Sequence, residues 1–332
     1  IELAESKTQW YIDDWAHYSL DCSEHLAEKG YIPDDNFEEA LISLGYDYGT
    51  PDDSVYNSIV ATVTSLSLSS KNIQSLEGIE LFTSLEQLNF SYNDISKVDL
   101  SHNLNLTELS CRENNLDSLN VSNNSKLISL DCNGNQISSI DLSSCLELQL
   151  LDCRKNTLQN LDISHNVKLT QITCLENYLT GLDPSSNTLL ENISCAYNKL
   201  SSLDVSHNPA LIFLSCNSNK LTKLNLSSNV LLKTIYCGYN QLTSLDLSNN
   251  SNLRDLNCEN NKLTSLNLKN GNNDNLYNVY TQYNPELLCI QVDNSRISES
   301  SSRWHEDSQA SYSEDCAYDF RKTYIPDDNF EQ

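Results

Sequence analysis

Leu253-Arg-Asp-Leu256-Asn-Cys258-Glu-Asn-Asn261-Lys-Leu263-Thr-Ser-Leu266-Asn-Leu268 is one copy of a unit that fills most of the chain. The unit reads LxxLxCxxNxLxxLDLSxNxx and is 21 residues long. A unit of this length that recurs in register predicts a solenoid, in which successive turns stack and bury one continuous core. The asparagines that mark the register at steps of 21 residues are Asn72, Asn93, Asn114, Asn135, Asn156, Asn177, Asn198, Asn219, Asn240 and Asn261, and a step of 23 residues leads to Asn284.

The first half of each unit predicts a short parallel strand. Leu256 and Cys258 point inward and the residue between them faces out, and each strand pairs with its copies about 4.8 Å away. The asparagine ends the strand, and its amide both donates and accepts hydrogen bonds to the bends of its own and the next unit. The second half nearly repeats the first and leaves no room for a helix. We expect a mostly β, weakly curved solenoid of about 11 turns over residues 61–288.

Residues 31–60 predict a helical N-terminal cap. Pro33 suits the first helical position, Asp34 and Asp35 suit the positive end of the helix dipole, and Gly45 ends the helix. A loop over residues 46–57 and a strand over residues 59–68 would join this helix to the first unit. The apolar stripe that would cover the end of the core comprises Phe37, Ala40, Leu41 and Leu44.

Eight cysteines occupy one position of the repeat, three residues before the asparagine. Such a column could hold metal or disulfides, but stacked parallel neighbours have poor geometry for a bridge, and no CxxC pair or in-register histidine completes a zinc site. We interpret these cysteines as small, buried, reduced residues, and we predict no metal site. They are Cys111, Cys132, Cys153, Cys174, Cys195, Cys216, Cys237 and Cys258, while Cys145 replaces the second asparagine of its own unit.

Three further cysteines lie outside this column. Cys289 and Cys316 fall in the C-terminal cap expected over residues 289–323, where a disulfide would close a loop of roughly 27 residues and stabilise it by about 3–4 kcal/mol. A free pair is the alternative. Cys22 has no evident partner, so it is either free or bridged to another molecule.

The two ends of the chain match one another. The pattern W-x-x-D-x-x-A-x-Y-S-x-D-C occurs at Trp10–Cys22 and Trp304–Cys316, and YIPDDNFE occurs at Tyr31–Glu38 and Tyr324–Glu331. We interpret residues 1–30 as the tail of a preceding module's C-terminal cap and residues 324–332 as the start of the next module's N-terminal cap. Tandem modules would then contact one another head to tail. A duplication confined to the caps is the alternative.

The charge balance limits the partners. The chain carries 46 acidic and 20 basic residues, a net charge of −26, which disfavours nucleic acid and anionic lipid and suits cations, basic proteins or neutral glycans. No apolar run approaches the length of a membrane span, and no signal peptide is visible. No catalytic constellation is found, because His102, His165 and His207 simply share one loop position. We therefore predict no enzyme activity and no cofactor.

Aromatic residues supply the only pattern typical of a binding surface. They gather at positions predicted to be exposed on the strands of the C-terminal half, where earlier units carry small polar or charged residues. An aromatic strip could hold a sugar ring or a partner loop, although scattered surface tyrosines are also common. The candidate binding residues are Tyr197, Phe213, Tyr236, Tyr239, Tyr280 and Tyr283.

One column of aspartates permits two interpretations. Its members could ligate calcium, or each could cap its own turn, which we favour. Asp47, Asp52 and Asp53 near Gly49 are a weaker indication of calcium. The column comprises Asp99, Asp141, Asp162, Asp183, Asp204 and Asp246.

The repeat from Ile59 to about Leu288 resembles the short-repeat class of bacterial leucine-rich-repeat proteins, which are relatives of the internalin-like surface proteins. Phe90 and Thr281 depart from it in the cysteine column, as does Cys145 in the second asparagine column. The resemblance implies an extracellular or bacterial cell-surface location and a role in binding or adhesion, without enzyme activity. We expect a structural or adhesive module of a tandem surface protein, or alternatively a receptor module for a protein or glycan.

Overall fold

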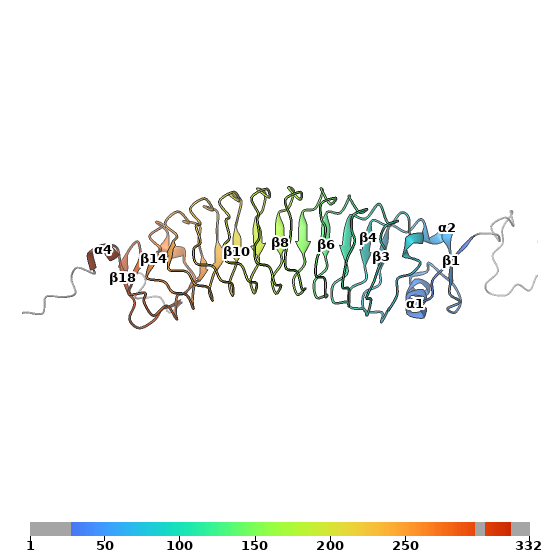
Figure 1. Cartoon of the computed structure of the whole chain (residues 1–332), viewed down its shortest axis with the longest axis horizontal. Coiled ribbons are helices and arrows are strands. Elements are labelled where there is room, and N and C mark those ends of the chain that lie inside the picture. The colour runs from blue at the N-terminus through green and yellow to red at the C-terminus, as the bar shows by residue number, and fades with distance from the viewer. Residues whose placement is uncertain (1–27, 296–302, 320–332) are drawn as a thin grey trace, which may run out of the picture. The chain divides into compact units, whose positions relative to one another are not determined.

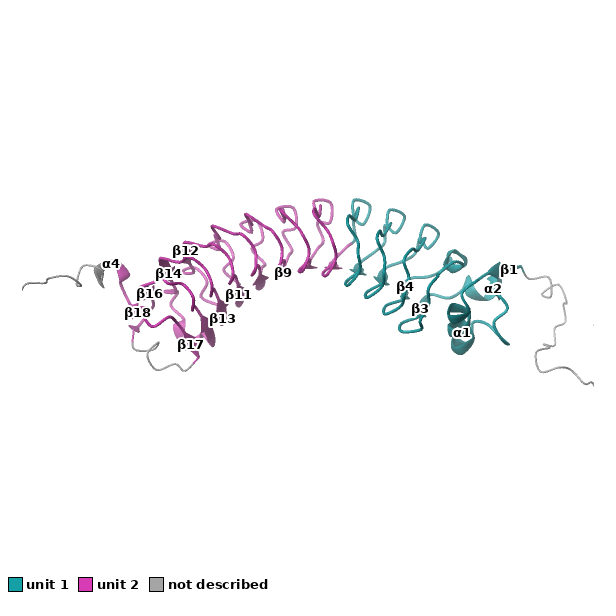
Figure 2. Cartoon of the chain, turned by 60° about the horizontal axis from the view of Figure 1, so that its bottom comes forward, with its two compact units in different colours: residues 1–147 teal, residues 148–332 magenta. Residues whose placement is uncertain are grey.

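The computed structural model describes residues 28–295 and 303–319 (Figure 1). The chain divides into two compact units, residues 1–147 and residues 148–332 (Figure 2). The matches at Trp10–Cys22 and Tyr324–Glu331 lie outside the described residues, so their interpretation stays a prediction. No helix in the described part of the chain is long and apolar enough to cross a membrane.

Unit 1 begins with the N-terminal cap. Strand β1 (Lys29–Tyr31) pairs antiparallel with β2 (Ser54–Tyr56), and the helices are α1 (Asp35–Leu44) and α2 (Asn57–Val60). Helix α1 begins one residue later than its capping residue Asp34, whose carboxylate accepts a hydrogen bond from the Phe37 amide at 3.0 Å. Pro33 therefore precedes the cap and is not the first helical residue.

Two further details of this cap differ from the sequence expectation. Leu44 is 44% exposed, whereas the other members of the apolar stripe are buried. The predicted strand over residues 59–68 is wrong before Ser65, because α2 occupies Asn57–Val60 and β3 spans only Ser65–Ser67. Gly45 does end α1, in the left-handed conformation with φ of 80° that glycine adopts without steric cost.

The coils of unit 1 stack through parallel strands. These are β3, β4 (Gln87–Asn89), β5 (Glu108–Ser110) and β6 (Ser129–Asp131), with a 3₁₀ turn η2 (Ile79–Leu81) between the first two. Residues 21 apart pair from β4 onward, but Leu66 pairs with Leu88, a step of 22. The first repeat is therefore one residue longer than the 21-residue turns that follow it in unit 1.

That extra residue removes Asn72 from the asparagine column. Lys71, not Asn72, lies one step of 22 before Asn93, and its backbone amide donates to the Asn93 side chain at 3.0 Å. Asn72 is exposed and has a left-handed backbone with φ of 58°. The prediction that Asn72 begins the ladder is wrong, because a step of 21 residues in sequence is not the register of the first pair of strands.

Unit 2 contains two parallel sheets. The first has the order β7, β8, β9, β10, β11, β13, β15 and β17, and residues 21 apart pair until Asp255 pairs with Asn278 at a step of 23. The 3₁₀ turn η3 (Asn273–Asn275) lies within this longer turn. The strands of this sheet are β7 (Leu150–Asp152), β8 (Gln171–Thr173), β9 (Asn192–Ser194), β10 (Phe213–Ser215), β11 (Thr234–Tyr236), β13 (Asp255–Asn257), β15 (Asn278–Tyr280) and β17 (Trp304–His305).

The second sheet of unit 2 is formed by the second halves of the last turns. Its strands are β12 (Ser244–Asp246), β14 (Ser265–Asn267), β16 (Cys289–Gln291) and β18 (Ser311–Ser313). Within the described residues, second-half strands occur only from Ser244 onward. The fold class is confirmed, since both units are parallel β solenoids with few helices and together hold about 12 turns. The weak curvature stays a prediction.

The C-terminal cap closes unit 2. The predicted disulfide between Cys289 and Cys316 is confirmed, and Cys316 begins the short helix α4 (Cys316–Asp319). Trp304 is buried with its ring edge-on to Tyr312 at 5.5 Å. The Asp307 carboxylate accepts hydrogen bonds from the amides of Tyr283 and Asn284 at 2.9 and 2.7 Å, which ties this cap to the preceding turn.

Candidate recognition surface

The asparagine column fixes the backbone that presents the candidate surface. The Asn240 side chain donates to the carbonyl oxygens of Cys216 and Cys237 at 3.0 and 3.1 Å, and it accepts from the Leu221 amide at 2.9 Å. One amide thus joins two successive turns and satisfies polar groups where the strand ends. The same donor and acceptor pattern is seen at Asn93, Asn114, Asn135, Asn177, Asn198, Asn219, Asn261 and Asn284.

A second asparagine column supports the opposite bends. The Asn208 side chain donates to the carbonyls of Pro184 and Asn187 at 3.0 and 2.9 Å, but its own oxygen has no partner among the described residues. Only the donor half of this amide is used. Cys145 fits the same position because its thiol points toward the carbonyls of Val121 and Asn124 at 3.8 and 3.9 Å.

The cysteines of the column are buried, and burial keeps their thiols unreactive. Its members are at most 1% exposed. Burial in apolar surroundings raises the pKa of Cys195 and of Cys258 to about 12, so these thiols stay protonated at neutral pH. The described residues contain no group of histidines, cysteines and acidic residues able to hold a metal ion.

Strand residues of unit 2 bring four rings into two contacting pairs. Phe213 on β10 and Tyr236 on β11 meet edge to face at 5.8 Å, and Tyr280 on β15 stacks on His305 of β17 at 4.8 Å. Tyr236 and Tyr280 also share one register position, separated by Asn257 on β13. We call Phe213, Tyr236, Tyr280 and His305 the aromatic face. It lies on neighbouring strands whose spacing is set by backbone hydrogen bonds.

The other three candidate aromatics do not lie on strands. Tyr197, Tyr239 and Tyr283 occupy the bend after the strand, immediately before the ladder asparagine, with φ of 53°, 55° and 60°. Their side chains are 53–63% exposed. The period-2 pattern assigned them to the strand because the left-handed bend cannot be read from side-chain alternation. The sequence therefore merged two separate sets of aromatic residues into one strip.

His305 is the member of the aromatic face that sequence reasoning missed. It belongs to the C-terminal cap, which departs from the 21-residue repeat, so its register with Tyr280 was not visible. The parallel pairing of β17 with β15 places its ring on that of Tyr280. The signal in the sequence was the pair Trp304-His305 in the segment after Cys289. A residue that points inward, Trp304, is followed there by one that faces outward, His305, as on the strands of the repeat.

One carboxylate, that of Asp255, lies near the aromatic face. Asp255 on β13 lies next to β11 in the sheet, and its carboxylate accepts a hydrogen bond from the Asn278 side chain at 2.6 Å. Partial burial raises the pKa of Tyr236, and the negative charge of Asp255 adds to this shift. An aromatic surface with a nearby carboxylate favours cationic and hydrogen-bonding groups over anionic ones.

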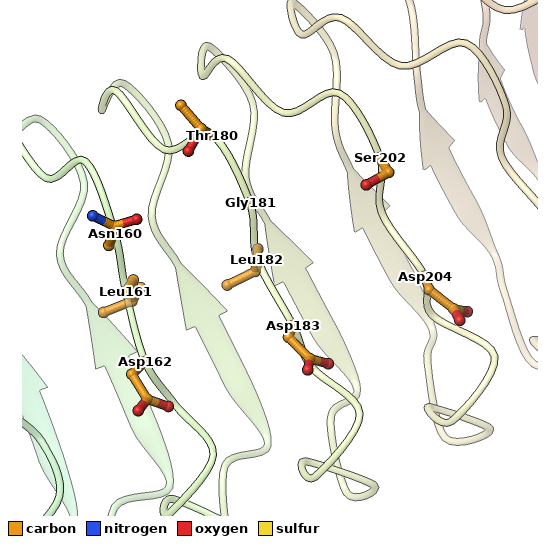
Figure 3. Close-up of a pocket in the computed structure, with 9 residues that line it drawn as sticks. All are labelled: Asn160, Leu161, Asp162, Thr180, Gly181, Leu182, Asp183, Ser202 and Asp204. Atoms are coloured by element: carbon orange, nitrogen blue, oxygen red, sulfur yellow. The ribbon is translucent and has the colours of Figure 1, made fainter.

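A hollow of about 680 Å³ lies over the second halves of three turns of unit 2 (Figure 3). Leu161 and Leu182 line it, and Gly181 has no side chain where neighbouring turns carry Asn160 and Ser202 (Figure 3). Asp183 lies on its rim. The space over Gly181 is open, since a Cβ built there would meet nothing within 4 Å.

Asp183 belongs to the aspartate column of the repeat, and the aspartates of that column cap their own turns. The Asp183 carboxylate accepts a hydrogen bond from the amide of Ser185 at 3.0 Å, and bonds from Ser185 lower the pKa of Asp183. This local bond is the turn-capping arrangement that we favoured over a calcium ladder. The equivalent bond is made by Asp99, Asp141, Asp162, Asp204 and Asp246.

The three aspartates of the second calcium indication, around Gly49, differ in their contacts. Asp52 binds the Lys29 ammonium group at 3.1 Å and the Ser54 hydroxyl at 2.5 Å. Asp53 contributes its backbone amide to Glu38 and has a left-handed φ of 61°. Asp47 is buried and lies beside Glu38.

Comparison with known proteins gives matches among solved structures only. The functional domain of InlJ from Listeria monocytogenes, which includes a cysteine ladder, is 30% identical, and the match has a TM-score of 0.65 and covers 86% of this chain and 70% of that one. InlF of the same organism is 19% identical over 85% of this chain and 95% of its own, with a TM-score of 0.66. Internalin C2 is 22% identical over 61% and 92%, with a TM-score of 0.55.

No family model and no curated protein matches the chain. The two lower identities show the fold alone. The match to InlJ extends to the sequence and includes a domain with its own cysteine ladder. With its 21-residue turns, its asparagine and cysteine columns and this similarity, the chain belongs to the internalin-like leucine-rich-repeat proteins.

Proposed function

We propose that the chain is a non-enzymatic, protein-binding module, displayed on a bacterial surface or secreted, and that the aromatic face is its recognition surface. The observation that carries this proposal is the pairing of Phe213 with Tyr236 and of Tyr280 with His305 on neighbouring strands. Membership of the internalin-like proteins supports a binding role.

The chemistry of the aromatic face favours a basic protein segment as its partner. Tyr236 is 38% exposed, so its ring offers apolar area while its hydroxyl can still bond to a partner. Arginine and lysine gain cation–π energy over tyrosine rings, and Asp255 adds a nearby negative charge. The net charge of −26 would also speed the approach of a basic partner.

Selection from a random-peptide phage library tests this proposal and does not require the natural partner. We expect peptides rich in Arg, Lys and aromatic residues to be enriched on the immobilised chain. Their affinity should fall at least tenfold for Tyr236→Ala, as is typical of a central aromatic contact. A library of neutral glycans screened in parallel distinguishes the glycan alternative.

Tyr178→Ala is the matched control for this experiment. Tyr178 is also an exposed tyrosine of unit 2, but it is not part of the aromatic face. Its ring contacts the Lys199 ammonium group. Peptide affinity should be unchanged in this variant. Equal binding by the wild type, Tyr236→Ala and Tyr280→Ala would contradict the assignment of the recognition surface.

A second proposal, tandem structural modules joined head to tail, is supported by the contacts of the C-terminal cap. Trp304, Asp307, Tyr312 and Cys316 each hold this cap together, and the same residue types recur at Trp10–Cys22. Lys29 and Gly30 belong to β1 of this chain's own N-terminal cap, so the predicted boundary at residue 30 falls too late. We propose that the residues before β1 complete such a cap on a preceding module. Disulfide mapping of the protein from its source should find Cys22 bonded to a cysteine before Ile1, and a free Cys22 thiol would contradict this arrangement.

The repeated segment at Tyr324–Glu331 gives the head-to-tail contact a separate test. In the described copy, the Asp34 carboxylate accepts from the amides of Gln74 and Ser75 at 2.8 Å, so this segment binds the first turn of a solenoid. We propose that residues 324–332 belong to the next module's cap. Deleting these residues should reduce self-association of the chain in sedimentation, and unchanged association would refute the docking of one copy on another.

A further inference from the structure

Two carboxyl groups are buried side by side in the N-terminal cap. Glu38 of α1 is fully buried and Asp47, just past the end of that helix, is 5% exposed. The two Glu38 oxygens accept hydrogen bonds from the backbone amides of Asp52 and Asp53 at 2.8 and 2.9 Å. The two carboxyl groups lie close enough for the charge of one to act on the other.

A hydrogen bond between two carboxyl groups requires a proton, because an ionised carboxylate only accepts. Among the described residues, Asp47 Oδ2 is buried without any hydrogen-bond donor. Two adjacent buried carboxylates would also repel one another strongly. We propose that Glu38 and Asp47 share one proton, and that this proton latches the segment from Tyr46 to Asp53 onto α1.

The charged and titratable groups around the pair do not replace that proton. Lys29 of β1 is partly exposed and is bound to the Asp52 carboxylate and the Ser54 hydroxyl, with its ammonium group 5.0 Å from the centre of the Tyr56 ring. Its charge therefore acts mainly on Asp52. The remaining groups that face the pair are Asp53 and Tyr48, whose backbone amides bond to Glu38 and Asp47.

Burial is the largest influence on both carboxyl groups and raises the pKa of Glu38 and of Asp47 above the ordinary range. The backbone amides oppose this shift without cancelling it. An acid with a raised pKa in the folded state stabilises that state at low pH, and its contribution is lost as the pH rises through the raised pKa. The latch is therefore closed at low pH and released as the pH rises through this raised pKa.

The latch acts on the part of the cap that borders the β1–β2 pair. Asp53 also accepts a hydrogen bond from the Ile32 amide at 3.0 Å through its carbonyl oxygen, so release of the segment loosens the edge of the β1–β2 pair. Helix α1 stays bound to the first turn of the solenoid through the hydrogen bonds of Asp34 and through the stacking of Phe37 on Phe82, whose ring centres are 6.2 Å apart. The expected opening is local to residues 46–56.

Amide hydrogen exchange of the whole chain as a function of pH tests the latch. After correction for intrinsic exchange rates, protection of the Asp52 and Asp53 amides should fall by up to about tenfold per pH unit as the pair loses its proton. In Asp47→Asn the side-chain amide donates to Glu38 at every pH, so protection should be independent of pH. Glu38→Gln also removes the shared proton, but its single oxygen can accept from only one of the two backbone amides. The amide that keeps its acceptor should show a flat profile, and the other should be weakly protected at every pH.

Glu39→Gln is the matched control, since it removes one exposed carboxylate from the same helix. Its profile should follow that of the wild type. A flat profile in the wild type, or a wild-type slope retained in both Asp47→Asn and Glu38→Gln, would overturn the shared proton. If one of these variants fails to fold, the other still gives the test.

Discussion

Replacing Asn240 by alanine tests how the stacked turns are held together. Asn240 is buried, and its side chain bonds to Cys216, Cys237 and Leu221. The two carbonyl oxygens keep a bond from another ladder asparagine in the variant, since Asn219 also donates to Cys216 and Asn261 to Cys237. In the part of the chain that the structure describes, the amide that loses its only partner is that of Leu221.

One buried N–H group without an acceptor costs about 1–3 kcal/mol, and we expect Asn240→Ala to lower the free energy of unfolding by that amount. Asn240→Asp should be worse at neutral pH, because a carboxylate can accept from Leu221 but is repelled by the carbonyl oxygens of Cys216 and Cys237. Acidification should restore part of this loss, since a protonated carboxyl can donate again.

Urea unfolding measures these changes, and hydrogen exchange at the Leu221 amide localises them. Asn249→Ala is the matched control, because Asn249 is exposed and makes a single long bond of 3.4 Å to Ser227. Its effect should stay within about 0.5 kcal/mol. If Asn240→Ala is no more destabilising than Asn249→Ala, the ladder does not stabilise the coil in the way that its bonds imply.

Three other outcomes are expected. Replacing both Cys289 and Cys316 by alanine should destabilise the C-terminal cap by about 3.5 kcal/mol from loop entropy, as measured by thermal unfolding with and without reductant, and an unchanged midpoint would contradict this. The thiols of Cys195 and Cys258 should resist alkylation at pH 9 in the folded chain and react after denaturation, because burial raises the pKa of each to about 12; fast labelling of the folded chain would refute their burial. Cys145→Asn should raise the free energy of unfolding of unit 1, measured in urea, by about 1 kcal/mol, because an amide donates more strongly than a thiol to the carbonyl oxygens of Val121 and Asn124. A lower free energy of unfolding would contradict this.

The repeated interior of the chain was the part most readable from sequence. Each interior turn packs between two other turns. The same pattern of leucine, cysteine and asparagine therefore predicts the same buried residues and the same hydrogen bonds in every interior turn. The Cys289–Cys316 disulfide was also predictable, because these cysteines fall outside the repeat.

The wrong predictions concern the end of the solenoid, where a turn has a neighbour on one side only, and turns that are longer than 21 residues. Asn72 was misplaced because the first turn contains one extra residue, which only strand pairing reveals. The segment before Ser65 packs against the N-terminal cap and not against an earlier turn, so its alternation did not make a strand. Tertiary packing overrides local pattern at such ends.

The candidate surface was readable only in part, for a related reason. Sequence spacing identifies columns of outward residues, but it does not separate a strand position such as Tyr236 from a left-handed bend position such as Tyr239. The stacking of His305 on Tyr280 depends on the pairing of β17, and the Glu38–Asp47 contact depends on how the chain returns after α1. These contacts join segments whose spacing follows no repeat.

Hydroxyl-radical footprinting of the chain, with and without a peptide selected on it, tests most directly whether the aromatic face is the recognition surface. We predict that the bound peptide protects Tyr236, Tyr280 and His305 from oxidation, while Tyr178 and the hollow lined by Leu161 and Leu182 react as in the free chain. Protection at the hollow with unchanged oxidation of Tyr236 and Tyr280 would contradict the assignment.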